Sequence, residues 1–157
     1  LNAAAGEPLP VYGDGLNGRD GLDVRNHCEA LDGVLTRGEI GRTYNVGGGA
    51  ERNNLELVTL LCDMLDARID PLPGGGVCKE LITFVEDRPG HDRRYAVDAG
   101  GINKELGWSP AETLESGLEQ TVSWYLDNPE WVEMVRSGEY RKWMAQHYAS
   151  DKEEDRK

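Results

Sequence analysis

Residues 43–65 read Thr-Tyr-Asn-Val-Gly-Gly-Gly-Ala-Glu-Arg-Asn-Asn-Leu-Glu-Leu-Val-Thr-Leu-Leu-Cys-Asp-Met-Leu. The first part of this stretch, Thr43–Val46, contains β-branched and aromatic side chains and predicts a short strand. Three glycines follow, and Asn53 then stands three residues before Glu56, which is the pattern of a capping box at the start of a helix. The apolar stripe of that helix is predicted from residues at helical spacing, namely Leu57, Leu61, Met64 and Leu65. A strand, a glycine loop and a helix in this order indicate a fold that combines strands with helices.

The residues before this stretch predict two short strands and a further helix. The strands are expected at Pro10–Tyr12 and Arg19–Val24, on either side of the turn Gly13-Asp14-Gly15. Asn26 is a suitable N-cap for the helix, and Gly38 is a suitable residue to end it.

The residues after this stretch predict two strands, three helical segments and a tail. The strands are expected at Leu81–Val85 and Tyr95–Val97, on either side of a charged loop. The helices are expected after Asp98, after Thr113 and after Asn128-Pro129, the last of them continuing as helical turns to Tyr148. Residues 151–157 are all charged and are expected to be a disordered tail. This order, with mixed short strands followed by helices alone, predicts an α/β or α+β fold with one domain over residues 1–150.

The composition excludes several classes of function. The chain has 157 residues, which is the size of one domain, and it carries 17 Lys and Arg against 29 Asp and Glu, a formal net charge of −12. Nucleic acids and anionic membrane surfaces need a basic face, so neither is an expected partner. No apolar run approaches the roughly 20 residues of a membrane span, and the first residues do not read as a signal peptide.

The cysteines and histidines form no recognisable disulfide, redox or metal motif. The three cysteines are an odd number without a close pair, and they are expected to be reduced thiols in a cytoplasmic protein. The three histidines lie far apart and match no known ligand spacing, so no metal site is expected.

The charged loop at residues 87–94 is the strongest local signal for binding. Three arginines and one histidine lie within its eight residues, in a chain that is otherwise acidic. The guanidinium fork of arginine suits bidentate binding of phosphate, so the loop is a candidate site for a pyrophosphate. The alternative is a set of surface salt bridges to the interspersed Asp87 and Asp92. Composition alone leaves both interpretations open.

Other motifs are weaker. The chain has no GxSxG elbow, no Walker A loop and no GxGxxG sequence that opens a helix. Gly47-Gly48-Gly49 stands before a helix and is either a structural loop or an anion-binding one, since helix N-termini attract anions. Tyr12 and Arg19 flank the first turn, where they either contact a base and a phosphate or are residues at the edge of a strand.

Four stretches taken together resemble one family. Pro8–Gly15 reads Pro-Leu-Pro-Val-Tyr-Gly-Asp-Gly and is soon followed by Arg19-Asp20, Thr43–Gly48 reads Thr-Tyr-Asn-Val-Gly-Gly, and Leu106–Pro110 reads Leu-Gly-Trp-Ser-Pro. Asp87–Asp98 reads Asp-Arg-Pro-Gly-His-Asp-Arg-Arg-Tyr-Ala-Val-Asp and is the most specific of them. They closely resemble the C-terminal half of dTDP-glucose 4,6-dehydratases, and the match extends to about Tyr148.

The resemblance implies an extended short-chain dehydrogenase, in which a Rossmann half holds NAD and a smaller C-terminal half binds the nucleotide sugar. The glycine fingerprint, the Tyr-x-x-x-Lys pair and the Thr-Asp-Glu group of that family lie in the Rossmann half. This chain is therefore expected to lack the Rossmann half, the NAD site and the catalytic residues, and to be inactive alone. The family resemblance assigns the dTDP-sugar to the following residues: Pro10 and Tyr12 near the base, Arg19 on phosphate, and Asn54, Asp87, Arg88, His91 and Tyr148.

The chain departs from the family pattern at four positions after Arg19-Asp20, namely Gly21, Asp23, Arg25 and Asn26. The family usually has tryptophan and tyrosine where this chain has Gly21 and Asp23. The loss of two aromatic side chains removes apolar packing area, and a glycine weakens a strand. Local packing around residues 21–25 is therefore expected to be weaker.

Two functions remain open at this stage. The first is the substrate-binding half of a dTDP-glucose 4,6-dehydratase-like protein that serves deoxysugar biosynthesis. The second is a non-catalytic, stand-alone module for nucleotide-sugar binding or oligomerisation. A homo-oligomer is expected in either case, with Thr43–Val46 pairing across a two-fold axis because an unpaired strand edge is a template for another chain.

Overall fold

The structure is a computed structural model that describes residues 1–72 and 74–138. It divides into two compact units, one spanning Leu1–Val122 and one that begins at Ser123. The single domain predicted over 1–150 stays a prediction, and the predicted tail at 151–157 lies outside the described residues. Within the described ranges, no helix is both long enough and apolar enough to cross a membrane.

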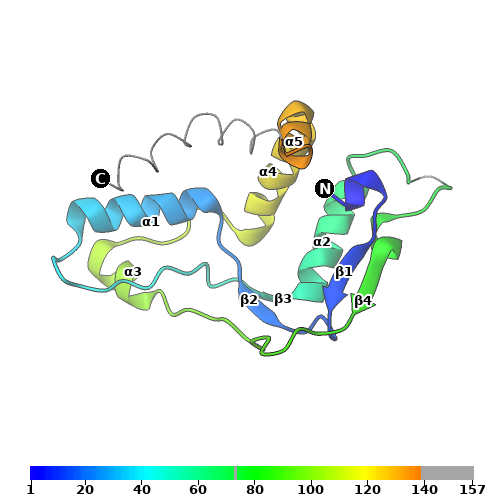
Figure 1. Ribbon diagram of the computed structural model, residues 1–157. Helices are drawn as coiled ribbons and strands as arrows, with labels where there is room; N and C mark the ends of the chain where they lie inside the picture. Colours follow the sequence, from blue (N-terminus) through cyan, green and yellow to red (C-terminus); the bar gives the residue numbers. More distant parts are fainter. Residues whose placement is uncertain (73, 139–157) are drawn as a thin grey trace, which may run out of the picture. The chain divides into compact units, whose positions relative to one another are not determined.

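The first unit contains a parallel strand pair. Strands β1 (Leu9–Tyr12) and β4 (Ile82–Val85) are hydrogen-bonded in parallel, with Leu9 opposite Ile82 and Tyr12 opposite Val85. Parallel strands need a long crossover connection, and here it includes helix α2 (Asn54–Asp66), which lies beside the pair (Figure 1). The predicted strand at 81–85 is thereby confirmed.

A small apolar core lies between α2 and two short 3-10 helices, η1 (Ala3–Ala5) and η2 (Cys78–Leu81). Its buried members are Ala3, Cys62 and Cys78, and the side chains packed around them are Leu9, Val58, Leu65, Ile69 and Leu81. The inward stripe of α2 is therefore Val58, Cys62 and Leu65. Of the predicted stripe, only Leu65 belongs to this cluster.

The second strand pair is antiparallel and joins β2 (Gly18–Asp20) to β3 (Glu51–Asn53). Of the two strands predicted on either side of the first turn, the first is one residue longer than predicted and the second is shortened to Gly18–Asp20. They pair with other segments and not with each other. The backbone of Arg93–Tyr95 runs along β2, because Gly18 N donates to Arg93 O at 2.9 Å and Tyr95 N donates to Gly18 O at 3.0 Å. The strand predicted at Tyr95–Val97 is wrong, since only Arg94 forms an isolated bridge to Gly18.

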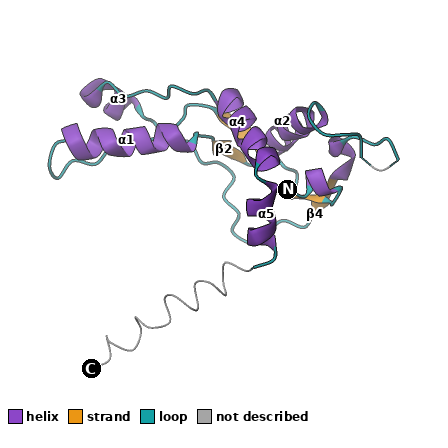
Figure 2. Cartoon of the chain, turned by 90° about the horizontal axis from the view of Figure 1, so that it is seen from above, coloured by secondary structure: helices purple, strands orange, loops and turns teal. Residues whose placement is uncertain are grey.

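Helices α1 (Val24–Arg37) and α3 (Gly100–Leu106) lie side by side and enclose a second core (Figure 1 and Figure 2). Its buried members are Ala30, Ile102 and Trp108, with Leu22, Val34, Tyr44, Val46, Ala99 and Leu106 packed against them. Residues 43–46 form no strand. The strand predicted at Thr43–Val46 is therefore wrong, and its proposed pairing with a second copy loses its basis. The apolar side chains that predicted the strand serve the helical core instead.

The helix caps show which local sequence patterns predict the ends of helices correctly. Asn53 Oδ1 accepts from Glu56 N at 2.8 Å and Glu56 Oε2 accepts from Asn53 N at 3.0 Å, which confirms the capping box of α2. Helix α1 is capped by Asp23 and not by Asn26, because Asn26 is buried inside the helix and bonded to residues 111 and 112. Its predicted end at Gly38 is confirmed.

Two further helices follow, α4 (Leu114–Asp127) and α5 (Pro129–Arg136). Thr113 opens α4 as predicted, with its hydroxyl accepting from Ser116 N at 3.1 Å. Pro129 is at the start of α5 as predicted, but the Asn128 side chain donates to Trp124 O at 2.8 Å and does not cap α5. In the second unit the rings of Trp124, Tyr125 and Trp131 contact one another edge to face. Helical turns predicted beyond residue 138 lie outside the described residues.

Candidate functional site

Arg19, His91 and Asp87 form a continuous chain of polar contacts. His91 Nδ1 lies 2.6 Å from Asp87 Oδ1, and His91 Nε2 lies 3.1 Å from Arg19 Nη2. Because a guanidinium nitrogen only donates, Nε2 is the acceptor, and the neutral ring carries its proton on Nδ1 and donates it to Asp87. The His91 side chain is 5% exposed and that of Asp87 is 43% exposed. The hydrogen bond from His91 lowers the pKa of Asp87 below its ordinary value of 3.8.

The Arg19 guanidinium is fixed by several contacts. Nη1 donates to Gly18 O at 2.6 Å, and Nη2 donates to Asp92 O at 3.0 Å. Its Cζ lies 4.7 Å from the centre of the Tyr95 ring, a cation–π contact. These contacts hold the planar fork of Arg19 in one orientation without a carboxylate partner within the described chain.

The strand topology brings Tyr12 to the same place. Tyr12 ends β1 and Asp87 follows β4, and the carboxyl ends of parallel strands lie at one edge of a sheet. The Tyr12 and His91 rings meet edge to face, with centroids 6.5 Å apart and an interplanar angle of 84°. Gly13 has φ of 60°, and a Cβ there would stand 2.9 Å from Asp87 Oδ2, so a glycine is needed for this close approach.

The structure thus brings four of the eight predicted site residues into direct contact and places three others nearby in the fold. Arg88 is exposed, and its guanidinium makes no ion pair within 1–72 and 74–138. Asn54 is the first residue of α2, and its N–H donates to Asn17 O at 3.1 Å. Pro10 is exposed on β1, two residues before Tyr12. Tyr148 lies outside the described residues.

The other two arginines of the charged loop are neutralised by carboxylates. Arg93 Nη1 lies 2.9 Å and 3.1 Å from the two carboxylate oxygens of Asp14. Arg94 forms a two-point pair with Glu51, at 2.6 Å and 2.8 Å. Both pairs lower the pKa of the carboxyl group concerned, and all four side chains are substantially exposed. The salt-bridge interpretation therefore holds for Arg93 and Arg94, although with partners other than Asp87 and Asp92.

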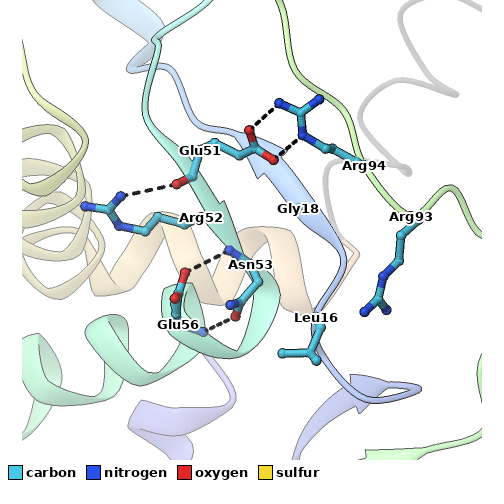
Figure 3. A pocket seen from close by; sticks show the side chains of 8 residues that line it. All are labelled: Leu16, Gly18, Glu51, Arg52, Asn53, Glu56, Arg93 and Arg94. Carbon is cyan, nitrogen blue, oxygen red and sulfur yellow. Dashed lines mark hydrogen bonds and ion pairs between the residues drawn. The ribbon is translucent and has the colours of Figure 1, made fainter.

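A pocket of about 440 Å³ opens beside β2 and β3 (Figure 3). It is lined by Leu16, Gly18, Glu51, Arg52, Asn53, Glu56, Arg93 and Arg94. Figure 3 shows that Glu51 meets Arg94 and that Glu56 is engaged in the capping box with Asn53. Its acidic groups are therefore satisfied within the protein, and the pocket offers fewer free charges than its composition indicates.

The glycine loop at residues 47–49 is structural. The Asp20 carboxylate accepts from Gly48 N at 3.0 Å and from Ala50 N at 2.9 Å. A Cβ on Gly48 would stand 2.0 Å from Gly21 O, so the loop packs directly on the backbone after β2. The N–H groups of Gly48 and Ala50 are therefore bonded to a carboxylate and are not free to bind a pyrophosphate.

Comparisons with known proteins identify the family of this chain. The family model described as GDP-mannose 4,6 dehydratase matches residues 1–121. The chain belongs to this dehydratase family. Among its relatives, the dTDP-glucose 4,6-dehydratase of Salmonella typhimurium is 53% identical over 148 residues, which are 94% of this chain and 40% of that protein. The chain thus spans about 40% of the length of the curated dehydratases that it matches, and the family resemblance seen in the sequence is confirmed.

Solved dehydratase structures share the fold. The dTDP-glucose 4,6-dehydratase of Bacillus anthracis in complex with NAD is 45% identical with a TM-score of 0.71, over 83% of this chain and 38% of that chain. The dehydratase DesIV of Streptomyces venezuelae, with NAD and TYD bound, is 39% identical with a TM-score of 0.73, over 83% of this chain and 37% of that chain. The chain therefore has the mixed α/β fold of one part of an extended short-chain dehydrogenase.

One buried residue at this site carries no sequence signal. Asn17 is 2% exposed and lies between the first turn and β2. Asparagine is common in glycine-rich turns, so neither its type nor its spacing distinguishes it from an ordinary turn residue.

Proposed function

We propose that this chain is the substrate-binding part of a dTDP-glucose 4,6-dehydratase-like protein and binds the dTDP-sugar. The observation that carries the proposal is the division among the arginines. Arg93 and Arg94 are bonded to carboxylates, whereas Arg19 and Arg88 have none in the described ranges. In a chain with a net charge of −12, two arginines free of carboxylates beside an exposed aromatic ring are a specific arrangement for an anionic nucleotide.

Each proposed contact follows from the chemistry of the side chain. Arg19 binds a phosphate oxygen with its remaining N–H groups, and Arg88 binds a second one from the exposed loop. Tyr12 is 47% exposed and offers a ring face or edge to the base. His91 and Asp87 hold Arg19 in place. Pro10, Asn54 and Tyr148 complete the proposed set on the strength of the family resemblance.

The complete dehydratase would use the bound substrate in a sequence of redox and elimination steps. By the family resemblance, NAD would supply a reversible hydride transfer with the hexose, from C4 and back to C6, and water would be lost across C5–C6. We assign none of these steps to the described residues. Their proposed role is to hold the nucleotide so that the sugar is presented in one orientation.

Calorimetric titration of the folded chain with dTDP tests the proposal. We expect saturable binding of dTDP at low ionic strength and much weaker binding of thymidine, which has the same base without the phosphates. Because the attraction between arginine and phosphate is screened by salt, dTDP affinity is expected to fall as salt is added. The absence of dTDP binding by a chain that shows a cooperative thermal transition would refute the proposal.

A further inference from the structure

Asn17 connects the three segments that carry the candidate site. Its backbone oxygen accepts from Asn54 N at 3.1 Å, at the start of α2. Its side-chain Nδ2 donates to Asp92 O at 3.1 Å, across 75 positions of sequence. The next residue, Gly18, bonds through its backbone to Arg93 and Tyr95. Strand β2, helix α2 and the charged loop therefore meet at one buried asparagine.

The carbonyl held by Asn17 also orients Arg19. Asp92 O accepts from Asn17 Nδ2 and from Arg19 Nη2, at 3.1 Å and 3.0 Å. Arg19 Nη2 is also the group that contacts His91 Nε2. A displacement of the Asp92 carbonyl would therefore change the direction of the Arg19 fork.

The bonding of Asn17 differs from that of a purely structural asparagine in the same protein. Asn26 is 1% exposed, and its amide makes three bonds, one donated to Glu112 O and two accepted from Ala111 N and Glu112 N. Asn17 is 2% exposed, yet its Oδ1 has no hydrogen-bond partner among the described residues. A buried oxygen without a partner reduces stability, so the contribution of Asn17 to stability alone does not explain its burial.

We propose that Asn17 is a positioning residue for nucleotide binding, which holds the Asp92 carbonyl and through it the Arg19 guanidinium. This rests on the proposed function, because it takes Arg19 to be a phosphate ligand. Asn17 itself touches no ligand in this proposal. Its effect is to remove alternative orientations of the Arg19 fork before the nucleotide arrives, which reduces the entropy lost on binding.

The test compares Asn17→Leu with Asn26→Leu in the full chain. Both variants replace a buried amide by an apolar side chain of similar size. We expect Asn17→Leu to weaken dTDP binding by about 3- to 10-fold, the equivalent of about one hydrogen bond, with a small change in melting temperature. Asn26→Leu leaves two backbone N–H groups unbonded, so it should lower the melting temperature more and leave dTDP affinity nearly unchanged.

An Arg19→Ala background separates positioning from a general structural role. If Asn17 acts through Arg19, the double variant with Asn17→Leu and Arg19→Ala should bind dTDP as tightly as Arg19→Ala alone. An equal loss in both backgrounds would overturn the proposal. If Asn17→Leu does not fold, Asn17→Ser takes its place, because its hydroxyl is too short to replace the bond to Asp92 O.

Hydrogen exchange supplies a readout without ligand. The amides of Gly18 and Tyr95 join β2 to the charged loop. In Asn17→Leu their exchange should rise by more than the loss of overall stability accounts for, whereas in Asn26→Leu it should only follow the loss of overall stability. If the unsubstituted chain does not bind dTDP, the proposed function fails, and exchange at these two amides alone decides whether Asn17 holds the loop. Unchanged exchange would overturn the proposal, and so would unchanged dTDP affinity in a chain that binds dTDP.

Discussion

At the scale of single residues, function depends on which charges find a partner inside the protein. Arg88 and Arg93 lie five positions apart on one exposed loop and have the same side chain. Arg93 is paired with Asp14, whereas Arg88 has no carboxylate partner within the described ranges. The same residue type is therefore proposed to have two different roles, and paired substitutions distinguish them.

Arg88→Ala is expected to weaken dTDP binding by about 5- to 30-fold, because it removes a charge-assisted bond to phosphate worth about 1–2 kcal/mol. The free energy of unfolding should change by less than about 0.5 kcal/mol. Arg93→Ala is the matched control, with the same change in net charge, and should have the smaller effect on dTDP affinity. Calorimetry and thermal melts measure both quantities. Equal losses of dTDP affinity in the two variants would contradict the assignment of Arg88.

The lowered pKa of Asp87 predicts that the stability of the folded chain depends on pH. Its folded pKa lies below the ordinary value of 3.8, chiefly because of the hydrogen bond from His91. The stabilisation is therefore present above about pH 4 and is lost as the pH falls through the folded pKa. Asp87→Asn imitates the uncharged state, so it should be less stable than the unsubstituted chain at pH 5–7. The two melting temperatures should converge as the pH falls through the folded pKa of Asp87. A difference that stays constant from pH 7 through that range would show that the charge of Asp87 is not responsible.

At the scale of elements, close approaches between backbones decide how the segments join. The loop after residue 46 packs against the backbone after β2, where a Cβ on Gly48 would stand 2.0 Å from Gly21 O. The same place contains a pocket of about 270 Å³, lined in part by Gly21, Pro110 and Leu114. Gly48 is thus required because a larger side chain would collide with the backbone. Gly21 lies at the edge of a pocket that no side chain fills.

Gly48→Ala is expected to lower the free energy of unfolding by more than about 2 kcal/mol, because its Cβ would stand 2.0 Å from a backbone oxygen that cannot rotate away. Gly101→Ala is the control. It lies in α3 with open space around its Cβ position, and it should stabilise the chain by about 0.5–1 kcal/mol. Urea unfolding measures both changes, and a Gly48→Ala variant as stable as the unsubstituted chain would contradict the close packing described for this loop.

Gly21→Trp is expected to raise the free energy of unfolding by about 1–2 kcal/mol, through burial of apolar area in the neighbouring pocket. Its Cβ would first meet Leu114 Cδ1, at 2.6 Å, the flexible end of a side chain that can move aside. Urea unfolding of Gly21→Trp, with Gly21→Ala beside it, measures how much of any gain comes from the ring. A Gly21→Trp variant less stable than Gly21→Ala would mean that the pocket cannot admit the ring.

At the scale of the whole molecule, net charge and local charge act in opposite directions. The net charge of −12 makes the folded chain repel itself, and the cluster around Arg19 and Arg88 attracts anions. An increase in salt from about 0.01 M to about 0.15 M shortens the screening length from about 30 Å to about 8 Å. We therefore expect the melting temperature to rise by a few degrees while dTDP affinity falls several-fold. A rise in both, or a fall in both, would show that one of these two electrostatic effects is wrongly assigned.

The sequence predicted local features well and pairings poorly. The capping box of α2 was readable because Asn53 and Glu56 are three residues apart and satisfy each other. The N-cap of α1 was not readable in this way, because Asn26 and Asp23 are both suitable N-cap residues. Contacts of Asn26 with residues 111 and 112 draw it into the interior. The strands show the same limit, since β1 pairs with a segment about 70 positions away.

The site shows the same division between local chemistry and tertiary contact. The sequence by itself determined the capping box of α2 and the end of α1 at Gly38, because these depend on side-chain chemistry and on neighbours within one turn. It also supplied, by family resemblance, the residues proposed for a nucleotide. Only the tertiary structure decided that Asp14 neutralises Arg93, that Glu51 neutralises Arg94 and that Asn17 holds the carbonyl that orients Arg19. These contacts join residues 43 to 79 positions apart. No local pattern specifies such pairs, because their geometry exists only after the strands and helices have packed.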